Sequence, residues 1–276
     1  MKLRKGLAVA ASCAALALSV APAWAQFTSS IEGTVTDSSG NLVLSHGSDP
    51  KGSGNAVNLH RITKNASMIW GGVRAENAWP STGLVPGNDY WMSFAVMMKS
   101  DEAIVPNTSD DSMLVFQTHT PAQGATQPDI ALFWRGQTKT MFWRVAYNTY
   151  PSNTWNYVGG SNPDYQGVTT VQTEAMPAAG VWTRFIVHYR PGYTTSQNPL
   201  LEIWRASAGT DYTKIVNYTG FNTYNSLSGP SYPRIGLYKW SSSTWNTNSL
   251  GFYMTPLHFG QGANLYDSAK AALSGF

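Results

Sequence analysis

Residues 113–120 read Met-Leu-Val-Phe-Gln-Thr-His-Thr and predict a β-strand with two different faces. Because successive side chains of a strand point to opposite sides, Gln117 and His119 share one face. The residues expected beside them are Met113 and Val115, and those expected on the other face are Leu114, Phe116 and Thr118. An amide beside an imidazole can hold a sugar acid and move a proton. The plainer alternative is a surface strand that ends in polar residues.

The rest of the chain contains many short segments rich in aromatic and β-branched residues, which favour strands. The expected strands cover residues 31–35, 56–62, 68–76, 90–99, 130–135, 141–147, 181–189, 200–206, 232–240 and 251–260. Residues 148–179 are expected to be irregular, and residues 207–230 to hold turns. Short strands at regular spacing predict an all-β sandwich. Because the sequence shows no repeat, linker or composition break, we expect one domain over residues 26–276.

Three local patterns sharpen this expectation. Segment 90–99 is long, aromatic and apolar, as expected for a strand buried on both faces. Segments 130–135 and 141–147 predict a hairpin across the polar residues 136–139. Only the tail, residues 266–273, has a helical pattern.

The first 25 residues predict a cleavable leader that is not part of the fold. Three of the first five residues are basic, residues 7–20 are apolar, and residues 23–25 (Ala-Trp-Ala) form a cleavage signal, so the mature chain is expected to begin at Gln26. The apolar run is too short for a membrane span. We therefore expect a secreted or periplasmic protein without membrane association after the leader is removed.

Removal of the leader changes the charge of the protein. The full chain has 18 Lys and Arg against 15 Asp and Glu, and three of the basic residues lie in the leader, which leaves 15 of each sign. We expect no nucleic-acid partner, and an anionic polysaccharide must be bound by locally placed Arg and Lys. The one cysteine, Cys13, is also in the leader, so the mature chain has no disulfide and must rely on its core. We expect a monomer.

Two further stretches carry a polar face like that of residues 113–120. Arg74 and Glu76 are two positions apart and therefore share one face of a strand. The residues expected to share a face in the third stretch are Tyr232, Arg234, Gly236 and Tyr238. Ile235 and Leu237, which alternate with them, can enter the core. Gly236 leaves bare backbone on the polar face, where a ligand can approach closely.

Together the three stretches have the form R-x-E, Q-x-H and Y-x-R-x-G-x-Y, in that order. This set resembles the motifs of the jelly-roll polysaccharide lyases: alginate lyases of the R-x-E-L, Q-I-H and Y-F-K-A-G-x-Y type, glucuronan lyases and the heparin lyase I group. Residues 256–260 resemble the last strand of that family. The chain departs from the pattern at Asn77, which replaces Leu, at Thr118, the central residue of Q-x-H, and at Arg234. Arg234 replaces Lys, which keeps the charge but changes its geometry.

The resemblance implies a fold and a reaction. The fold is a β-jelly roll sandwich of two antiparallel sheets, concanavalin-like, with a short C-terminal helix. The reaction is β-elimination in a 4-linked polyuronate of the glucuronan or alginate type, which removes the proton on C5 and expels the oxygen on C4. Arg74 and Gln117 would hold the carboxylate and stabilise the developing charge. His119 would act as the base or as a neutral partner of the carboxylate.

The resemblance assigns proton transfer to the leaving oxygen to Tyr238, which for one stereochemistry could also take the C5 proton. A phenol with an ordinary pKa near 10 is a poor base, and Arg234, four residues earlier on the same face, is expected to favour its phenolate. Glu76 is expected to orient Arg74. The remaining expected substrate contacts are Tyr232, Trp134, Arg135 and Arg144, the last three to flanking sugars.

No cofactor is expected. The acidic residues Asp101, Glu102, Asp110 and Asp111 could hold a structural calcium ion, but they lack an EF-hand pattern, and solvated loop charge is the better interpretation. Two other protein classes are Trp-rich β-sandwiches: a non-catalytic carbohydrate-binding module and a jelly-roll glycoside hydrolase. The hydrolase would need paired carboxylates about 5–10 Å apart, for which there is no motif. The binding module would not need His, Tyr, Arg and Gln on one face.

Overall fold

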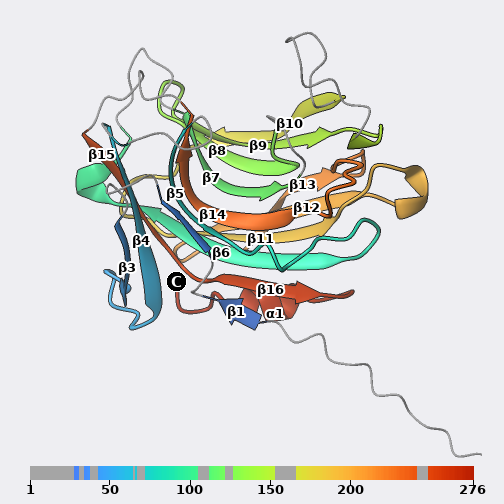
Figure 1. The fold of residues 1–276 in the computed structure, drawn as a ribbon. Helices are drawn as coiled ribbons and strands as arrows, with labels where there is room; N and C mark the ends of the chain where they lie inside the picture. Colours follow the sequence, from blue (N-terminus) through green and yellow to red (C-terminus); the bar gives the residue numbers. More distant parts are fainter. Residues whose placement is uncertain are drawn as a thin grey trace, which may run out of the picture.

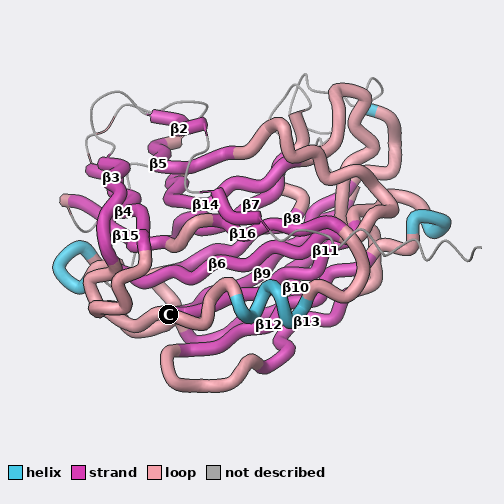
Figure 2. The backbone as a smooth tube through the Cα atoms, turned by 90° about the horizontal axis from the view of Figure 1, so that it is seen from below, coloured by secondary structure: helices cyan, strands magenta, loops and turns pink. Residues whose placement is uncertain are grey.

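The computed structural model describes residues 28–30, 34–37, 43–64, 66, 72–104, 112–121, 127–152, 166–240 and 248–276. These residues form two antiparallel sheets that lie one above the other (Figure 1). The expected leader, its cleavage site and Cys13 lie outside the described residues. Figure 2 shows that helix is confined to short segments, and the predicted all-β jelly roll with a short C-terminal helix is confirmed.

The nine-stranded sheet runs in the order β13 (Thr213–Tyr218), β12 (Leu200–Ser207), β11 (Thr183–Arg190), β6 (Tyr90–Met98), β15 (Ser249–Met254), β4 (Ala56–Thr63) and β3 (Val43–Ser48). At its side, β16 (Leu257–Gln261) pairs with β6 and with β1 (Thr28–Ser30). The seven-stranded sheet runs in the order β10 (Gly167–Ala175), β9 (Thr140–Tyr147), β8 (Ile130–Arg135), β7 (Ser112–His119), β14 (Tyr232–Lys239), β5 (Val73–Ala78) and β2 (Thr34–Asp37). The helical segments are η1 (Ser100–Glu102), η3 (Thr195–Gln197) and α1 (Tyr266–Ala271).

The main core lies between the two sheets. Strand β6 is buried along its whole length, as its apolar sequence predicts. Its Met92, Phe94 and Val96 pack into this core, while Trp91 joins a second cluster with Ala269 of α1 on the outer face of the same sheet. Phe94 stacks on Phe116 of the facing sheet, with ring centroids 4.9 Å apart.

Four other local predictions can be compared with the structure. Strands β8 and β9 form the expected hairpin, and the expected tail helix is α1. The prediction that residues 148–179 are irregular is wrong for β10, which pairs with β9 along its length. Residues 207–230 contain strand β13 as well as turns. Both strands lie at the edge of a sheet, where alternating polar residues give a weak apolar signal.

The predicted faces of β7 need a correction. A β-bulge interrupts the pairing with β8 between Leu114 and Phe116, so Val115 has no partner there. As a result Met113, Val115 and Phe116 all belong to the core between the sheets, while Leu114 belongs to a cluster on the opposite face. Gln117 and His119 therefore do not share a face with Met113 and Val115. We call the face of the seven-stranded sheet that points away from the core the site face.

Candidate active site

The three sequence motifs lie on adjacent strands, because β14 pairs with β5 on one side and with β7 on the other. In the register, Arg234 is opposite Gln117 of β7, and Gly236 is opposite Glu76 of β5. Ile235 and Leu237 enter the core as predicted. The polar residues of all three motifs thus meet on the site face, which the alternation along each strand predicts.

The backbone at Gly236 requires glycine. Its φ is +142°, and a Cβ atom at this position would lie 2.2 Å from the carbonyl oxygen of Ala75 and 2.6 Å from the Cα atom of Glu76. The same Cβ atom would lie 2.9 Å from Nδ1 of the buried His60 on β4, so glycine allows close packing at this point. On the site face, Nε2 of Gln117 donates a hydrogen bond to Oε1 of Glu76.

Glu76 is the centre of the polar cluster. It is buried, and its Oε2 accepts a hydrogen bond of 2.9 Å from Nη1 of Arg74 and lies 3.7 Å from Nη1 of Arg234. The bond to Arg74 is the one expected for a residue that orients this arginine. Two guanidinium groups around one carboxylate leave an excess of one positive charge in a buried setting. Such a cluster suits an anionic ligand.

His119 lies at one end of this cluster, directly opposite Tyr232 in the register. Its Nδ1 is 2.6 Å from the carbonyl oxygen of Thr120. A carbonyl oxygen only accepts, so Nδ1 carries the hydrogen and Nε2 carries the lone pair. Burial and the Arg234 guanidinium lower the pKa of the imidazole from 6.5 to about 4. His119 is therefore neutral at neutral pH and can accept a proton at Nε2.

Tyr232 and Arg234 are bonded to each other. Nη2 of Arg234 donates a hydrogen bond to the Tyr232 hydroxyl oxygen, and its guanidinium lies 5.0 Å from the centre of the Tyr232 ring. An arginine can only donate, so the hydrogen of the Tyr232 hydroxyl stays available for another acceptor.

Tyr238 lies at the opposite end of the cluster. Its ring lies over the Arg74 guanidinium, with 3.6 Å between Cζ and the ring centroid. Burial raises the pKa of the phenol, and the opposing effect of Arg74 does not reverse this. The prediction that Arg234 favours a Tyr238 phenolate is wrong, because Arg234 bonds to Tyr232 and the cation beside Tyr238 is Arg74. Tyr238 is a protonated phenol at neutral pH.

The three residues expected to contact flanking sugars divide into two groups. Trp134 is fully buried in the core between the sheets, with its ring 5.0 Å from Phe252, so its assignment as a substrate contact is withdrawn. It alternates with Phe133 and Arg135, which leaves these two on the site face. Arg144 is also on that face, where its Cζ lies 4.3 Å from the centre of the Phe133 ring.

The structure adds an apolar cluster beside these arginines that the sequence motifs did not predict. Its members on the site face are Leu114, Ala131, Phe133, Phe142 and Tyr238. Trp240 contacts it through Phe133 and Tyr238. One sequence signal could have found Trp240, since it continues the alternation of the third motif by two positions beyond Tyr238.

Other charged groups have structural partners. In η1, Asp101 pairs with Lys99, and Glu102 pairs with Lys99 and Arg61, while Asp110 and Asp111 lie outside the described residues. Within the described part of the chain there is no group of three or more His, Cys, Asp or Glu placed to hold a metal ion. No helix among the described residues is long and apolar enough to cross a membrane.

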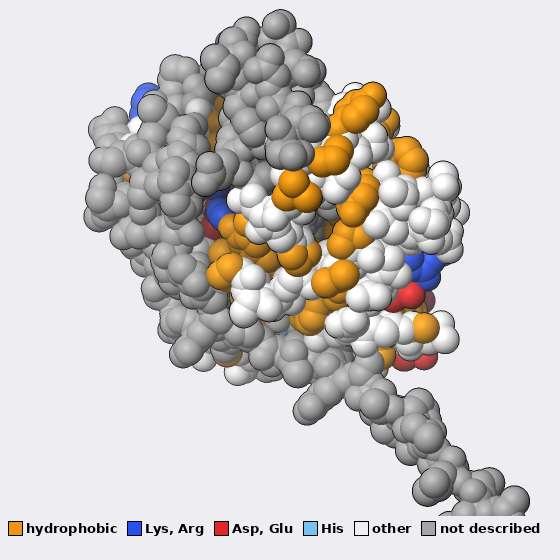
Figure 3. All heavy atoms as spheres, turned by 45° about the vertical axis from the view of Figure 1, so that its right-hand side comes forward, with side chains coloured by type: hydrophobic (Ala, Val, Ile, Leu, Met, Phe, Trp, Pro, Cys, Tyr) orange, Lys and Arg blue, Asp and Glu red, His pale blue; other side chains and the backbone are white. Residues whose placement is uncertain are grey.

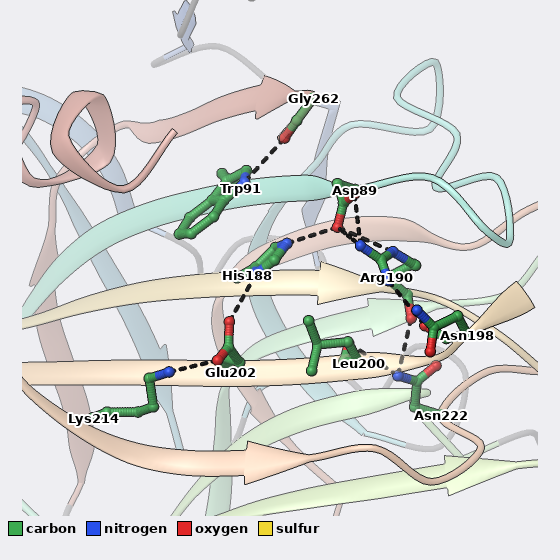
Figure 4. A network of polar contacts seen from close by, with 10 residues as sticks. All are labelled: Asp89, Trp91, His188, Arg190, Asn198, Leu200, Glu202, Lys214, Asn222 and Gly262. Carbon is green, nitrogen blue, oxygen red and sulfur yellow. Dashed lines mark hydrogen bonds and ion pairs between the residues drawn. The ribbon is translucent and has the colours of Figure 1, made fainter. Parts of the chain in front are cut away.

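A second polar network lies on the outer face of the nine-stranded sheet (Figure 4). His188 bridges Asp89 and Glu202 through its two ring nitrogens, at 2.7 and 2.9 Å, and stacks on Trp91 with 4.0 Å between ring centroids. Lys214 extends the network by pairing with Glu202. These contacts join β6, β11, β12 and β13, so the network ties together strands on the far side from the site face.

Comparisons with known proteins give one family and a set of structural neighbours. A family model described as "Polysaccharide lyase" matches residues 29–254. No curated protein sequence gives a match. Among solved structures, an endo-β-1,4-glucuronan lyase from Trichoderma reesei aligns with a TM-score of 0.60 and 17% identity over 84% of this chain and 95% of that one.

Two alginate lyases give similar alignments, each with a TM-score of 0.51. The exolytic PL7 enzyme of Zobellia galactanivorans is 14% identical, over 83% of this chain and 90% of that one. The enzyme from Klebsiella pneumoniae is 12% identical, over 81% of this chain and 96% of that one. At such identities the likeness shows a shared fold.

Proposed function

The chain belongs to the polysaccharide lyase family, and we propose that it cleaves a 4-linked polyuronate of the glucuronan or alginate type at the cluster around Glu76. The observation that carries this proposal is the sharing of one buried carboxylate by two guanidinium groups, Arg74 and Arg234, between a neutral histidine and a protonated tyrosine. This combination has an anion-binding centre with a base at one end and an acid at the other.

The two proton-transfer roles follow from the opposite pKa shifts of His119 and Tyr238. Paired groups whose environments move their pKa values apart mark the base and the acid of a reaction. His119 keeps a free lone pair on Nε2 at neutral pH, which supports its role as the base. Tyr238 keeps its proton, which supports its role as the acid and disfavours its use as the base.

The proposed reaction transfers two protons and one electron pair. Nε2 of His119 takes the proton from C5, and the electron pair of that C–H bond passes through an enolate-like dianion into a new C4–C5 double bond. The C4–oxygen bond breaks, and the Tyr238 hydroxyl gives its proton to the leaving oxygen. Arg74 and Arg234 would stabilise the dianion because they already converge on one carboxylate. Removal of the C5 proton is difficult while the neighbouring carboxylate of the substrate keeps its full negative charge. Binding of that carboxylate by the two arginines is therefore the main task of the site.

Gln117 is proposed as a further carboxylate ligand. Its amide is buried and donates one N–H to Glu76. An amide nitrogen carries two hydrogens, so a second donor remains in the same group. Tyr232 and its partner Arg234 would hold the sugar at the His119 end of the cluster.

The charge of the chain favours a non-sulfated substrate. A sulfated polysaccharide would require a large excess of basic residues, whereas the chain without its first 25 residues has equal numbers of acidic and basic groups. Among the described side chains visible in Figure 3, hydrophobic ones are many and charged ones are few.

The experiment is a panel of purified polyuronates assayed by ultraviolet absorbance of the unsaturated uronate that elimination creates. We expect a rise in absorbance with glucuronan or alginate and none with neutral glucans. Absence of this product from every uronan would overturn the proposed substrate class. Release of saturated ends would instead indicate hydrolysis.

We also propose that the enzyme acts outside the cytoplasm, after a leader ending at Ala25 is removed. N-terminal sequencing of exported protein tests this directly. The expected first residue is Gln26, and an exported chain that still begins at Met1 would contradict the proposal.

A further inference from the structure

Trp240 stands at the border of the proposed active site and is 39% exposed. It follows the last residue of β14 and lies two positions after Tyr238. Its ring meets the Tyr238 ring at a centroid distance of 6.3 Å and an angle of 64°, and the Phe133 ring at 5.8 Å and 74°. Both contacts are edge-to-face, so the Trp240 ring is not stacked face to face on either of the two other rings.

Trp240 is continuous with an aromatic surface on β8 and β9, which lie beyond β7 in the sheet. Phe133 of β8 and Phe142 of β9 stack with 4.8 Å between their centroids and 2° between their planes. This stack lies on the site face, outside the core between the sheets, where Phe133 is buried and Phe142 is partly buried. The stack therefore supports Trp240, whose indole is the exposed aromatic surface that a ligand can reach.

Two arginines lie over the same rings. Cζ of Arg144 is 4.3 Å from the centroid of Phe133, and Cζ of Arg135 is 5.1 Å from that of Phe142. Each is held in place by a hydrogen bond, from Arg135 Nε to the Ser112 hydroxyl and from Arg144 Nη2 to the Gln127 side chain. These contacts fix the guanidinium groups close to the aromatic surface, where they can meet an anion.

We propose that Trp240, Phe133, Phe142, Arg135 and Arg144 form a second sugar-binding subsite, which holds the uronate residues on the Tyr238 side of the cleaved bond. We call this surface the aromatic–arginine patch, and its assignment rests on the proposed function. A polyuronate has an apolar ring face and one carboxylate in every residue. The patch offers an exposed indole to the apolar ring face and two guanidinium groups to the carboxylates.

The patch should make cleavage depend on chain length. An octamer can occupy the cluster around Glu76 and extend across β8 and β9 at the same time, whereas a trimer covers less of this surface. Energy from contacts remote from the reacting bond raises kcat/KM for the longer substrate. Loss of one aromatic contact worth about 1.4 kcal/mol corresponds to a tenfold change in affinity.

The test compares kcat/KM for octameric and trimeric oligouronates of the best substrate in wild type, Trp240→Ala and Trp240→Phe. We expect the octamer-to-trimer ratio to fall about tenfold in Trp240→Ala and less in Trp240→Phe, which keeps an aromatic ring. Thermal unfolding of each variant shows whether it is folded. If Trp240→Ala does not fold, Trp240→Phe alone carries the comparison.

Trp204→Ala is the matched control. Trp204 is a partly buried tryptophan on the outer face of the nine-stranded sheet, beside Trp91 and with Lys214 over its ring. Its loss should lower the melting temperature and leave the octamer-to-trimer ratio at the wild-type value. A wild-type ratio in both Trp240 variants would overturn the subsite while leaving the proposed function intact. A wild-type enzyme without elimination activity would overturn the proposed function itself.

Discussion

Tyr232 lies directly opposite His119 in the pairing of β14 with β7, whereas Tyr238 on the same strand lies opposite Leu114. The two tyrosines therefore stand at the two ends of the cluster centred on Glu76. Arg234 bonds to the first, and the Arg74 guanidinium lies under the ring of the second. A uronate bound above Gly236 would lie between these arginines, with His119 on one side and Tyr238 on the other.

The pH dependence of the reaction should follow the protonation of His119. Because burial and Arg234 lower its pKa to about 4, the base stays neutral well below the ordinary histidine range. We expect the acid limb of the kcat/KM profile near pH 4, and Arg234→Gln should move this limb to higher pH, since a positive charge that opposes protonation is removed. A limb near the ordinary histidine value in wild type, unmoved by Arg234→Gln, would rule out His119 as the base.

Arg74→Ala should affect both binding and turnover. Arg74 contacts Glu76 and the Tyr238 ring at the same time, so its loss removes a carboxylate ligand and a support of the proposed acid. We expect KM to rise and kcat to fall, so that kcat/KM decreases by roughly 10²-fold or more. This is the magnitude expected for the loss of a charge-assisted contact. Steady-state kinetics on the preferred polyuronate measure both. Arg184→Ala, on β11 of the other sheet, is the control, and an equal loss there would contradict a local role.

A buried carboxylate outside the reacting groups should make stability depend on pH. Asp129 is fully buried beside the end of β7, and it accepts hydrogen bonds from the hydroxyls of Thr223 and Ser231. Burial raises its pKa from 3.8 to about 7. A raised folded-state pKa contributes stability that is complete below the unfolded value and is lost as the pH rises through about 7.

Asp129→Asn removes this titration. Between about pH 4 and about pH 8, we expect the melting temperature of wild type to decrease relative to that of the variant. The corresponding loss in free energy of unfolding is no more than ~4 kcal/mol. Thermal unfolding across that range measures it. Parallel curves for the two proteins would show that Asp129 does not titrate in this window.

Alternation along single strands accounts for much of what the sequence predicted correctly. It placed Arg74 with Glu76, and Tyr232 with Arg234 and Tyr238, because β5 and β14 pair in regular register with each other. It did not predict the register shift of β14 against β7 between Ile235 and Tyr238. It failed at β7, where the bulge at Val115 moves Leu114 to the site face. A bulge depends on how two strands pair, which the sequence of one strand does not contain.

Register explains the other failures. The spacing of Arg234 and Tyr238 on one strand suggested that they interact, but the guanidinium beside Tyr238 comes from Arg74 on the adjacent strand. Trp134 was expected to contact flanking sugars together with Arg135 and Arg144, yet its position in the β8 alternation places it in the core. The same alternation, read from Tyr238 onward, would have pointed to Trp240.

Tyr238→Phe, compared with Tyr232→Phe, tests the central claim most directly. Both changes remove one hydroxyl from the same strand and keep the ring, so both proteins should remain folded. If Tyr238 is the acid, its loss should reduce elimination by about 10²–10⁴-fold, whereas Tyr232→Phe should mainly raise KM. The measurement is the initial rate of ultraviolet absorbance on the best polyuronate, with wild type alongside. Near-wild-type elimination by Tyr238→Phe would contradict the account, and loss of activity only in Tyr232→Phe would assign the acid to the tyrosine opposite His119.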